Sequence, residues 1–141
     1  MSDPYPPETL HEDDDNGTMP ANVESLAQHV IGRKIVSVEM NPEGGKWGEP
    51  QTTLVLDNGK RVSLVDTDDC CAFTSLSEFW MDPSAVDHVI LGVGTTDGYT
   101  TWHIYADFGD IMRLKVGWSA GNPFYYGYGF DIVVTEPQPN P

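Results

Sequence analysis

The segment Asp66-Thr67-Asp68-Asp69-Cys70-Cys71 holds the densest group of reactive side chains in the sequence. Its three carboxylates and two thiols follow a predicted strand, and a neighbouring strand could add a histidine. Such a set suggests either a cation site or a thiol nucleophile with a histidine base. One hypothesis for function is therefore a metal-dependent or thiol enzyme. Its residues would be Asp66, Asp68, Asp69, Cys70, Cys71 and His103.

The spacing within this segment argues against both kinds of chemistry. Zinc sites need closely spaced Cys or His pairs, and calcium loops need a turn glycine and a late glutamate, which this segment lacks. Adjacent cysteines rarely form a disulfide, and the nearby carboxylates disfavour a thiolate at Cys70 or Cys71. The simpler interpretation is that one cysteine packs in the core while the aspartates cap a turn before Ser75. We therefore expect no metal and no cofactor.

Catalysis of other kinds has no clear signature either. The chain contains no serine-hydrolase motif, although catalytic triads are assembled in space and need no fixed spacing. The glycine-rich segment 92–98 resembles a phosphate-binding loop only superficially, because β-branched and aromatic residues follow it instead of a helix. A hairpin turn is the better interpretation of that segment. These observations favour a protein that is not an enzyme.

Aromatic residues are concentrated towards the C-terminal end of the chain. Residues two apart on a strand share a face, so Trp102 and Ile104 should point one way and His103 and Tyr105 the other. Tyr and Trp are favoured at interfaces because they bury a large area with few rotatable bonds. The alternative is that these rings close one end of a small sheet or barrel. The candidate binding residues are Trp102, Tyr105, Trp118, Phe124, Tyr125, Tyr126 and Tyr128.

The net charge restricts the classes of partner. With 22 acidic and 7 basic residues, the formal net charge is −15, which argues against direct binding to nucleic acids or to anionic membranes. The charge allows a basic protein partner, a cation site, or solubility through self-repulsion. An acidic DNA mimic is a further hypothesis, although 6 of the 22 acidic residues lie within residues 1–20.

Local patterns predict two helices and one well-defined hairpin. Asn22 is the expected N-cap of a helix that ends at Gly32, and Ser75 is the expected cap of a short helix at residues 75–80. Asn58-Gly59 lies between two β-rich runs, which predicts a hairpin with a type I′ turn. Seven strands are expected, of which the last four should form a meander. Their ranges are 33–40, 52–56, 60–65, 88–93, 100–106, 111–118 and 128–135.

These elements predict an α+β fold. We expect a mainly antiparallel, strongly curved sheet or partial barrel of about seven strands with one or two short helices. Residues 1–20 should be a disordered acidic, Pro-rich tail, residues 21–135 a single domain, and residues 136–141 a disordered Pro-rich C-terminus. No apolar run is long enough to span a membrane, and the first residues lack a signal-peptide pattern.

Three motifs carry a resemblance to a known group of proteins. They are Cys70-Cys71-Ala72, Trp102-His103-Ile104-Tyr105 and Tyr125-Tyr126-Gly127-Tyr128-Gly129-Phe130. Over roughly residues 30–134, the chain resembles small uncharacterised proteins encoded by actinobacterial phages, including mycobacteriophages. That group has no established reaction, so the resemblance implies no catalytic residues. It implies an accessory phage protein made in the host cytoplasm, a reducing compartment that suits two free thiols.

The function expected from this setting is interference with the host. By analogy with other small non-structural phage proteins, the protein should bind a host cytoplasmic protein and inhibit growth or act as a cytotoxic factor. Its acidic field would speed encounter with a basic patch, and exposed aromatic side chains would anchor the contact. The sequence does not identify the host protein, and it leaves homo-oligomerisation open.

Overall fold

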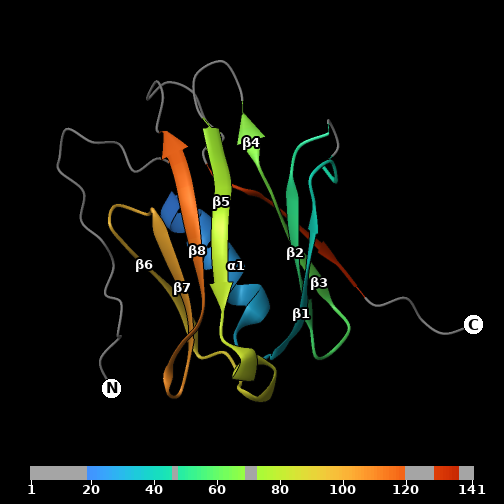
Figure 1. Ribbon diagram of the computed structural model, residues 1–141, viewed down its shortest axis with the longest axis vertical. Helices are drawn as coiled ribbons and strands as arrows, with labels where there is room; N and C mark the ends of the chain where they lie inside the picture. Colours follow the sequence, from blue (N-terminus) through green and yellow to red (C-terminus); the bar gives the residue numbers. More distant parts are fainter. Residues whose placement is uncertain (1–18, 46–47, 69–72, 120–128, 137–141) are drawn as a thin grey trace, which may run out of the picture.

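The computed structural model describes residues 19–45, 48–68, 73–119 and 129–136 (Figure 1). These residues form one α-helix, one 3-10 helix and nine β-strands. In chain order the elements are α1 (Met19–Val30), β1 (Ile35–Asn41), β2 (Gln51–Leu56), β3 (Arg61–Val65), β4 (Thr67–Asp68), β5 (Phe73–Met81), η1 (Pro83–Asp87), β6 (Gly92–Thr96), β7 (Thr101–Ala106), β8 (Gly109–Ser119) and β9 (Asp131–Thr135).

The strands form two sheets in which all pairs are antiparallel. One sheet has the order β1-β2-β3-β9 and the other the order β4-β5-β8-β7-β6. Figure 1 shows the two sheets side by side, with α1 behind β5 and between them. Residues of both sheets and of α1, among them Leu26, Leu64 and Trp102, form one hydrophobic core. Removing this apolar surface from water is the main stabilising contribution to the fold.

Helix α1 begins earlier than the predicted cap at Asn22. Met19 is already helical and fully buried, and Leu26 and Val30 continue the same apolar stripe into the core. The expected end is confirmed, because Gly32 has a φ of +85° and its N–H bonds the carbonyl of Ile90. Met19 therefore belongs to the packed part of the chain, although it lies within the predicted tail of residues 1–20.

Asn22 ties the helix to the far end of the chain. Its side-chain Nδ2 donates to the carbonyl of Phe130 at 2.9 Å, and its Oδ1 accepts from the N–H of Phe130 at 3.0 Å. Phe130 precedes β9 and its ring packs edge-on against Trp102, with centroids 5.3 Å apart. Asn is favoured at helix caps because its side chain readily hydrogen-bonds backbone groups. Here the Asn22 side chain bonds the backbone of a distant residue instead, and so forms a tertiary contact.

The β2–β3 hairpin is confirmed, but its turn is not type I′. Gly59 has a φ of +85°, whereas Asn58 is not among the residues with positive φ. The Gly59 N–H donates to the Leu56 carbonyl and the Leu56 N–H to the Lys60 carbonyl. This is a three-residue loop, in which a type I turn is followed by a left-handed glycine. The Asn58 side chain accepts from the N–H of Lys60 and stabilises the loop.

The helix predicted at residues 75–80 is wrong, because these residues lie in β5. Strand β5 pairs with β8 along its length, but the register shifts between Leu76 and Glu78. The extra residue of this bulge makes Leu76 and Phe79 point into the core three positions apart, which imitates helical spacing. Asp82 then caps η1 by accepting from the N–H and hydroxyl of Ser84.

The predicted four-strand meander is correct for three strands only. Strands β6, β7 and β8 follow one another, and β6 begins at Gly92 instead of His88. Strand β9 returns to pair with β3 in the other sheet. The mainly antiparallel α+β class is confirmed, with the strands divided between two sheets; closure into a strongly curved sheet or partial barrel stays a prediction. Among the described residues, no helix has the length and apolar character that crossing a bilayer requires.

Candidate functional site

A chain of hydrogen-bonded side chains runs across the face of the five-stranded sheet that points away from the core, which we call the outer face. Thr96 Oγ1 lies 2.8 Å from His103 Nε2, and His103 Nδ1 lies 2.8 Å from Asp110 Oδ2. The side chain of His103 is 10% exposed and that of Asp110 is 5% exposed. Hydroxyl, imidazole and carboxylate thus form one row, in which Thr96 is half-buried and the other two side chains are nearly buried. We call this row the histidine relay.

Strand geometry explains why these three residues meet. Thr96 pairs with Thr101, so His103 lies diagonally across from Thr96 on the same face. Asp110 pairs with Tyr105, which again places Asp110 diagonally across from His103. The three side chains therefore come from three consecutive strands, and the two short turns between those strands set the spacing.

A β-bulge gives Asp110 its position. His103 pairs with Arg113 and Ile104 with Met112, but the register then shifts and Tyr105 pairs with Asp110. In an unbroken ladder Asp110 would be opposite Ala106 and would point into the core. The bulge also leaves Ile111 fully buried next to the outward-facing Asp110. Bulges often re-aim a side chain in this way beside functional sites.

Arg113 extends the relay towards β5. Its Nε donates to the same Oδ2 of Asp110 at 2.7 Å, and a carboxylate oxygen that accepts from both a guanidinium and an imidazole is in its ionised form. The guanidinium carbon also lies 4.9 Å from the centre of the Trp80 ring. Trp80 is 44% exposed, so this cation–π pair is presented on the surface.

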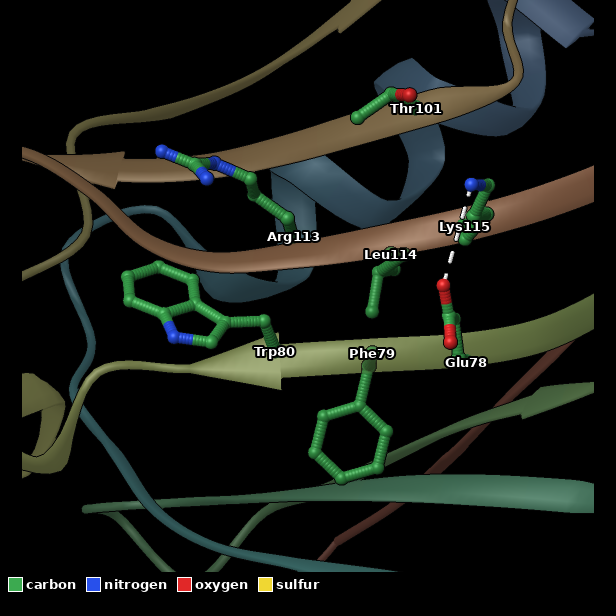
Figure 2. Close-up of a pocket in the computed structure, with 7 residues that line it drawn as sticks. All are labelled: Glu78, Phe79, Trp80, Thr101, Arg113, Leu114 and Lys115. Atoms are coloured by element: carbon green, nitrogen blue, oxygen red, sulfur yellow. Dashed lines mark ion pairs between the residues drawn. The ribbon is translucent and has the colours of Figure 1, made fainter.

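A groove of about 370 Å³ lies beside the relay. Figure 2 shows the Arg113–Trp80 pair towards one end and the Glu78–Lys115 ion pair towards the other. Thr101 borders the groove on β7 and is the cross-strand partner of Thr96. The lining residues are Glu78, Phe79, Trp80, Thr101, Arg113, Leu114 and Lys115. We call this cavity the outer groove.

The turn that follows Thr96 is strained. Asp97, Gly98 and Tyr99 have φ values of +60°, +67° and +64°, a conformation that costs a residue such as Tyr roughly 1–2 kcal/mol. Each of the three carbonyls accepts a side-chain bond, from the Thr100 hydroxyl, the Trp118 indole and the Trp102 indole respectively. These three donors stabilise the turn. Because β6 and β7 pair antiparallel on either side of it, the hairpin predicted from residues 92–98 is confirmed.

The structure divides the predicted aromatic residues between two environments. Trp102 is fully buried in the core, so it is not available to a partner. Tyr105 is half-buried on the outer face, while Trp118 is half-buried and packs edge-on against Tyr99. The predicted alternation is correct, since Trp102 and Ile104 face inward. Phe124, Tyr125, Tyr126 and Tyr128 lie outside the described residues.

The Asp66–Cys71 segment lies where the chain passes from one sheet to the other. Asp66 Oδ1 accepts from the N–H of Leu76 at 3.2 Å, and partial burial raises the pKa of the Asp66 carboxyl. A pocket of about 420 Å³ borders Asp66, Thr67 and Phe73. Asp68 is in β4, and Asp69, Cys70 and Cys71 lie outside the described residues.

Asp66 and His103 are not brought together. His103 pairs with Arg113 on β8, and Arg113 in turn pairs with Trp80 near the end of β5. Asp66 instead accepts from the N–H of Leu76, which is nearer the start of β5. In the part of the chain that the structure describes, no three His, Cys, Asp or Glu residues form a group that could hold a metal ion. His103 is engaged in the relay instead.

Sequence reasoning singled out His103 but missed the residues around it. Thr96, Asp110, Arg113 and Trp80 were not identified, because the first three depend on strand register and Trp80 was assigned to a helix. One signal was available. His103 lies on the side of its strand opposite to the buried Trp102 and Ile104, which marks it as a polar residue outside the core. Asp110 has no such signal, because by alternation it shares the side of Met112 and Leu114 and reaches the outer face only through the bulge.

These features define a mainly antiparallel α+β domain with a polar relay and a groove on the open face of one sheet. Residues 28–132 match the family described as Domain of unknown function (DUF7448), and the chain belongs to that family. Neither the curated proteins nor the solved structures include a significant match to the chain.

Proposed function

We propose that this protein acts by binding a host protein, as an accessory factor of an actinobacterial phage, and that the outer face of the five-stranded sheet is its contact surface. The observation that carries the proposal is the exposed Trp80 ring beneath the Arg113 guanidinium. Trp and Arg are enriched among the residues that dominate binding energy in protein interfaces. The phage setting rests on the sequence resemblance.

Other properties of the outer face support this assignment. Phe73 and Trp80 are both on β5 and both exposed, at 42% and 44%. Exposed aromatic rings on a hydrogen-bonded strand are rigid anchors, because they lose little conformational freedom on binding. Arg113 and Lys115 on neighbouring β8 balance the carboxylates of Asp110 and Glu78, so the outer face here is close to neutral although the chain is acidic. A partner segment with an apolar residue fits this pattern.

The test is affinity capture from an actinobacterial host lysate with wild-type protein and two variants. Trp80→Ala removes the proposed anchor. Leu91→Ala is the matched control, because Leu91 is 54% exposed and precedes β6, so it is in neither sheet. We expect the same host protein to be captured by wild type and Leu91→Ala. We expect its affinity for Trp80→Ala to fall about 30-fold, corresponding to loss of a strong anchor residue.

Growth of the host on induced expression gives an independent measurement. Inhibition by wild type and Leu91→Ala, together with its loss in Trp80→Ala, would support the proposal. Thermal denaturation of each variant shows that it is folded. Equal capture by all three proteins, or loss only in Leu91→Ala, would place the contact elsewhere and refute the assignment to the outer face.

A further inference from the structure

The histidine relay has the order of groups found in hydroxyl-nucleophile hydrolases. A hydroxyl contacts one nitrogen of an imidazole, and a carboxylate contacts the other. We propose that Thr96, His103 and Asp110 form a catalytic site for acyl transfer, with carboxylic esters as the substrate class. This inference goes beyond the proposed binding function and does not depend on it.

The hydrogen bonds are compatible with the proton positions that this chemistry needs. Asp110 in its ionised form can only accept, so Nδ1 of His103 carries a proton and donates to it. In the neutral imidazole Nε2 is then an acceptor, to which the Thr96 hydroxyl donates. This is the tautomer of a general base. Asp110 is a positioning residue that also stabilises the imidazolium formed during the reaction.

The reaction balances without any redox partner. Thr96 Oγ1 bonds to the ester carbonyl carbon while its proton moves to His103 Nε2. The bond from that carbon to the alcohol oxygen then breaks, and His103 returns the proton to the leaving alcohol. Water next attacks the acyl-threonine, His103 accepts a proton from the water, and the acid leaves as the proton passes back to Thr96 Oγ1.

The outer groove supplies a place for the substrate next to the nucleophile. Thr101 borders the groove and faces Thr96 across the ladder, where directly opposed side chains are about 5 Å apart at Cβ. Trp80 offers a flat apolar surface (Figure 2). The Lys115 ammonium is 3.9 Å from Glu78 in a loose, exposed ion pair, so it is able to turn towards a negatively charged group in the groove. The groove thus suits an ester with an apolar part and a negatively charged group.

Two backbone features beside the relay also support a functional site. The bulge in β8 turns Asp110 outward to reach His103. The strained turn begins directly after Thr96, with Tyr99 held in the left-handed region. Such strain persists only where surrounding contacts hold it, and it is concentrated at functional sites. The fold therefore maintains two local irregularities at the two outer members of the relay.

The experiment measures ester hydrolysis by the purified full chain. The two substrates are 4-nitrophenyl acetate and the negatively charged 4-nitrophenyl hemisuccinate. We expect kcat to fall on the order of 100-fold in Thr96→Val and in His103→Gln, the size of a lost general-base contribution. Thr96→Ser keeps a hydroxyl and should retain activity. Lys115→Gln should raise KM for the hemisuccinate only.

Thr135→Val is the matched control, because Thr135 is exposed on β9 in the other sheet, away from the relay and the groove. It should leave kcat unchanged. A fluorophosphonate probe followed by peptide mass spectrometry should label Thr96 in the wild type and not in His103→Gln. Asp110→Asn should lower kcat with little change in KM.

The proposal is overturned if wild type hydrolyses neither ester faster than free imidazole, if the probe labels another residue, or if Thr96→Val retains activity in the folded state. Circular dichroism of each variant establishes that it is folded. Because the assay contains no host protein, its failure leaves the capture experiment unaffected, and loss of capture in Trp80→Ala says nothing about hydrolysis.

Discussion

The contact between Asn22 and Gly129 yields a quantitative prediction about how the two ends of the fold are joined. Gly129 has a φ of +103°, and a Cβ at this position would lie 2.7 Å from Cγ of Asn22 and 2.9 Å from its Oδ1. Gly129→Ala therefore combines two costs. The left-handed backbone costs about 1–2 kcal/mol, and the displaced Asn22 side chain loses its bonds to Phe130.

The size of the second cost follows from the burial of Phe130. This residue is 4% exposed, and each buried polar group left without a partner costs about 1–3 kcal/mol. Asn22→Ala leaves the N–H and carbonyl of Phe130 without these bonds, which for two fully buried groups would cost about 2–6 kcal/mol. Because both bonds are only partly buried, we expect the lower part of that range, about 2–4 kcal/mol. Gly129→Ala should lose the same two bonds and add its backbone strain, so its total cost should be about 3–6 kcal/mol.

The two changes should not add. In the Asn22→Ala background the Cγ and Oδ1 that a new Cβ would meet are absent, so Gly129→Ala should then cost only the strain of about 1–2 kcal/mol. The double variant should be more stable than the sum of the single effects by the cost of the lost bonds, about 2–4 kcal/mol, which is at the upper end of coupling energies for residues in contact. Gly32→Ala is the matched control, since Gly32 has a φ of +85° and nothing within 4 Å of the new Cβ.

Urea denaturation followed by tryptophan fluorescence measures all four free energies, because Trp102 packs against Phe130. Gly32→Ala should lose only about 1–2 kcal/mol. The reasoning is refuted if the two single effects add to within about 0.5 kcal/mol, since that is the behaviour of independent sites. It is also refuted if Gly129→Ala costs no more than Gly32→Ala.

Two further predictions concern a turn and a carboxyl group. Asn58→Gly should destabilise the hairpin by about 0.5–1 kcal/mol. The change removes the side-chain bond to the Lys60 N–H, and it adds conformational freedom to the unfolded chain at a residue whose φ needs no glycine. Unchanged or increased stability in urea denaturation would contradict this. Burial raises the pKa of Asp66 above 3.8, so the folded state resists its ionisation and loses stability as the pH rises through the window from 3.8 up to the raised pKa. Asp66→Asn should therefore be more stable than wild type at neutral pH, with the difference vanishing below that window; a constant difference between pH 3 and pH 7 in thermal denaturation would contradict this.

Some of the fold could be predicted because its signals are local. The stripe Val23, Leu26 and Val30 has helical spacing, and Gly32 ends the helix in the conformation that glycine adopts most easily. The hairpin around Gly59 follows from two β-rich runs with a turn pair between them. The alternation of Trp102 and Ile104 against His103 and Tyr105 is a property of any strand.

The errors occurred where a bulge changed the strand period. In β5 the extra residue near Ser77 placed Leu76 and Phe79 on the same face, and the capping pattern of Ser75 with Glu78 reinforced a helix. In β8 the bulge turned Asp110 outward. Sequence patterns assume an unbroken period, so a single inserted residue reverses the face of everything beyond it.

The sequence by itself determined the acidic charge, the antiparallel α+β class, the β2–β3 hairpin and the two faces of β7, because these depend on composition and on contacts between near neighbours. Only the tertiary structure decided that β9 pairs with β3, that Asn22 binds Phe130, and that Thr96, His103 and Asp110 form one row. Those contacts depend on strand register and on packing between residues far apart in the chain. The sequence suggested His103 as a metal ligand or as the base for a cysteine. In the structure it is hydrogen-bonded instead to Thr96 and Asp110 on the adjacent strands.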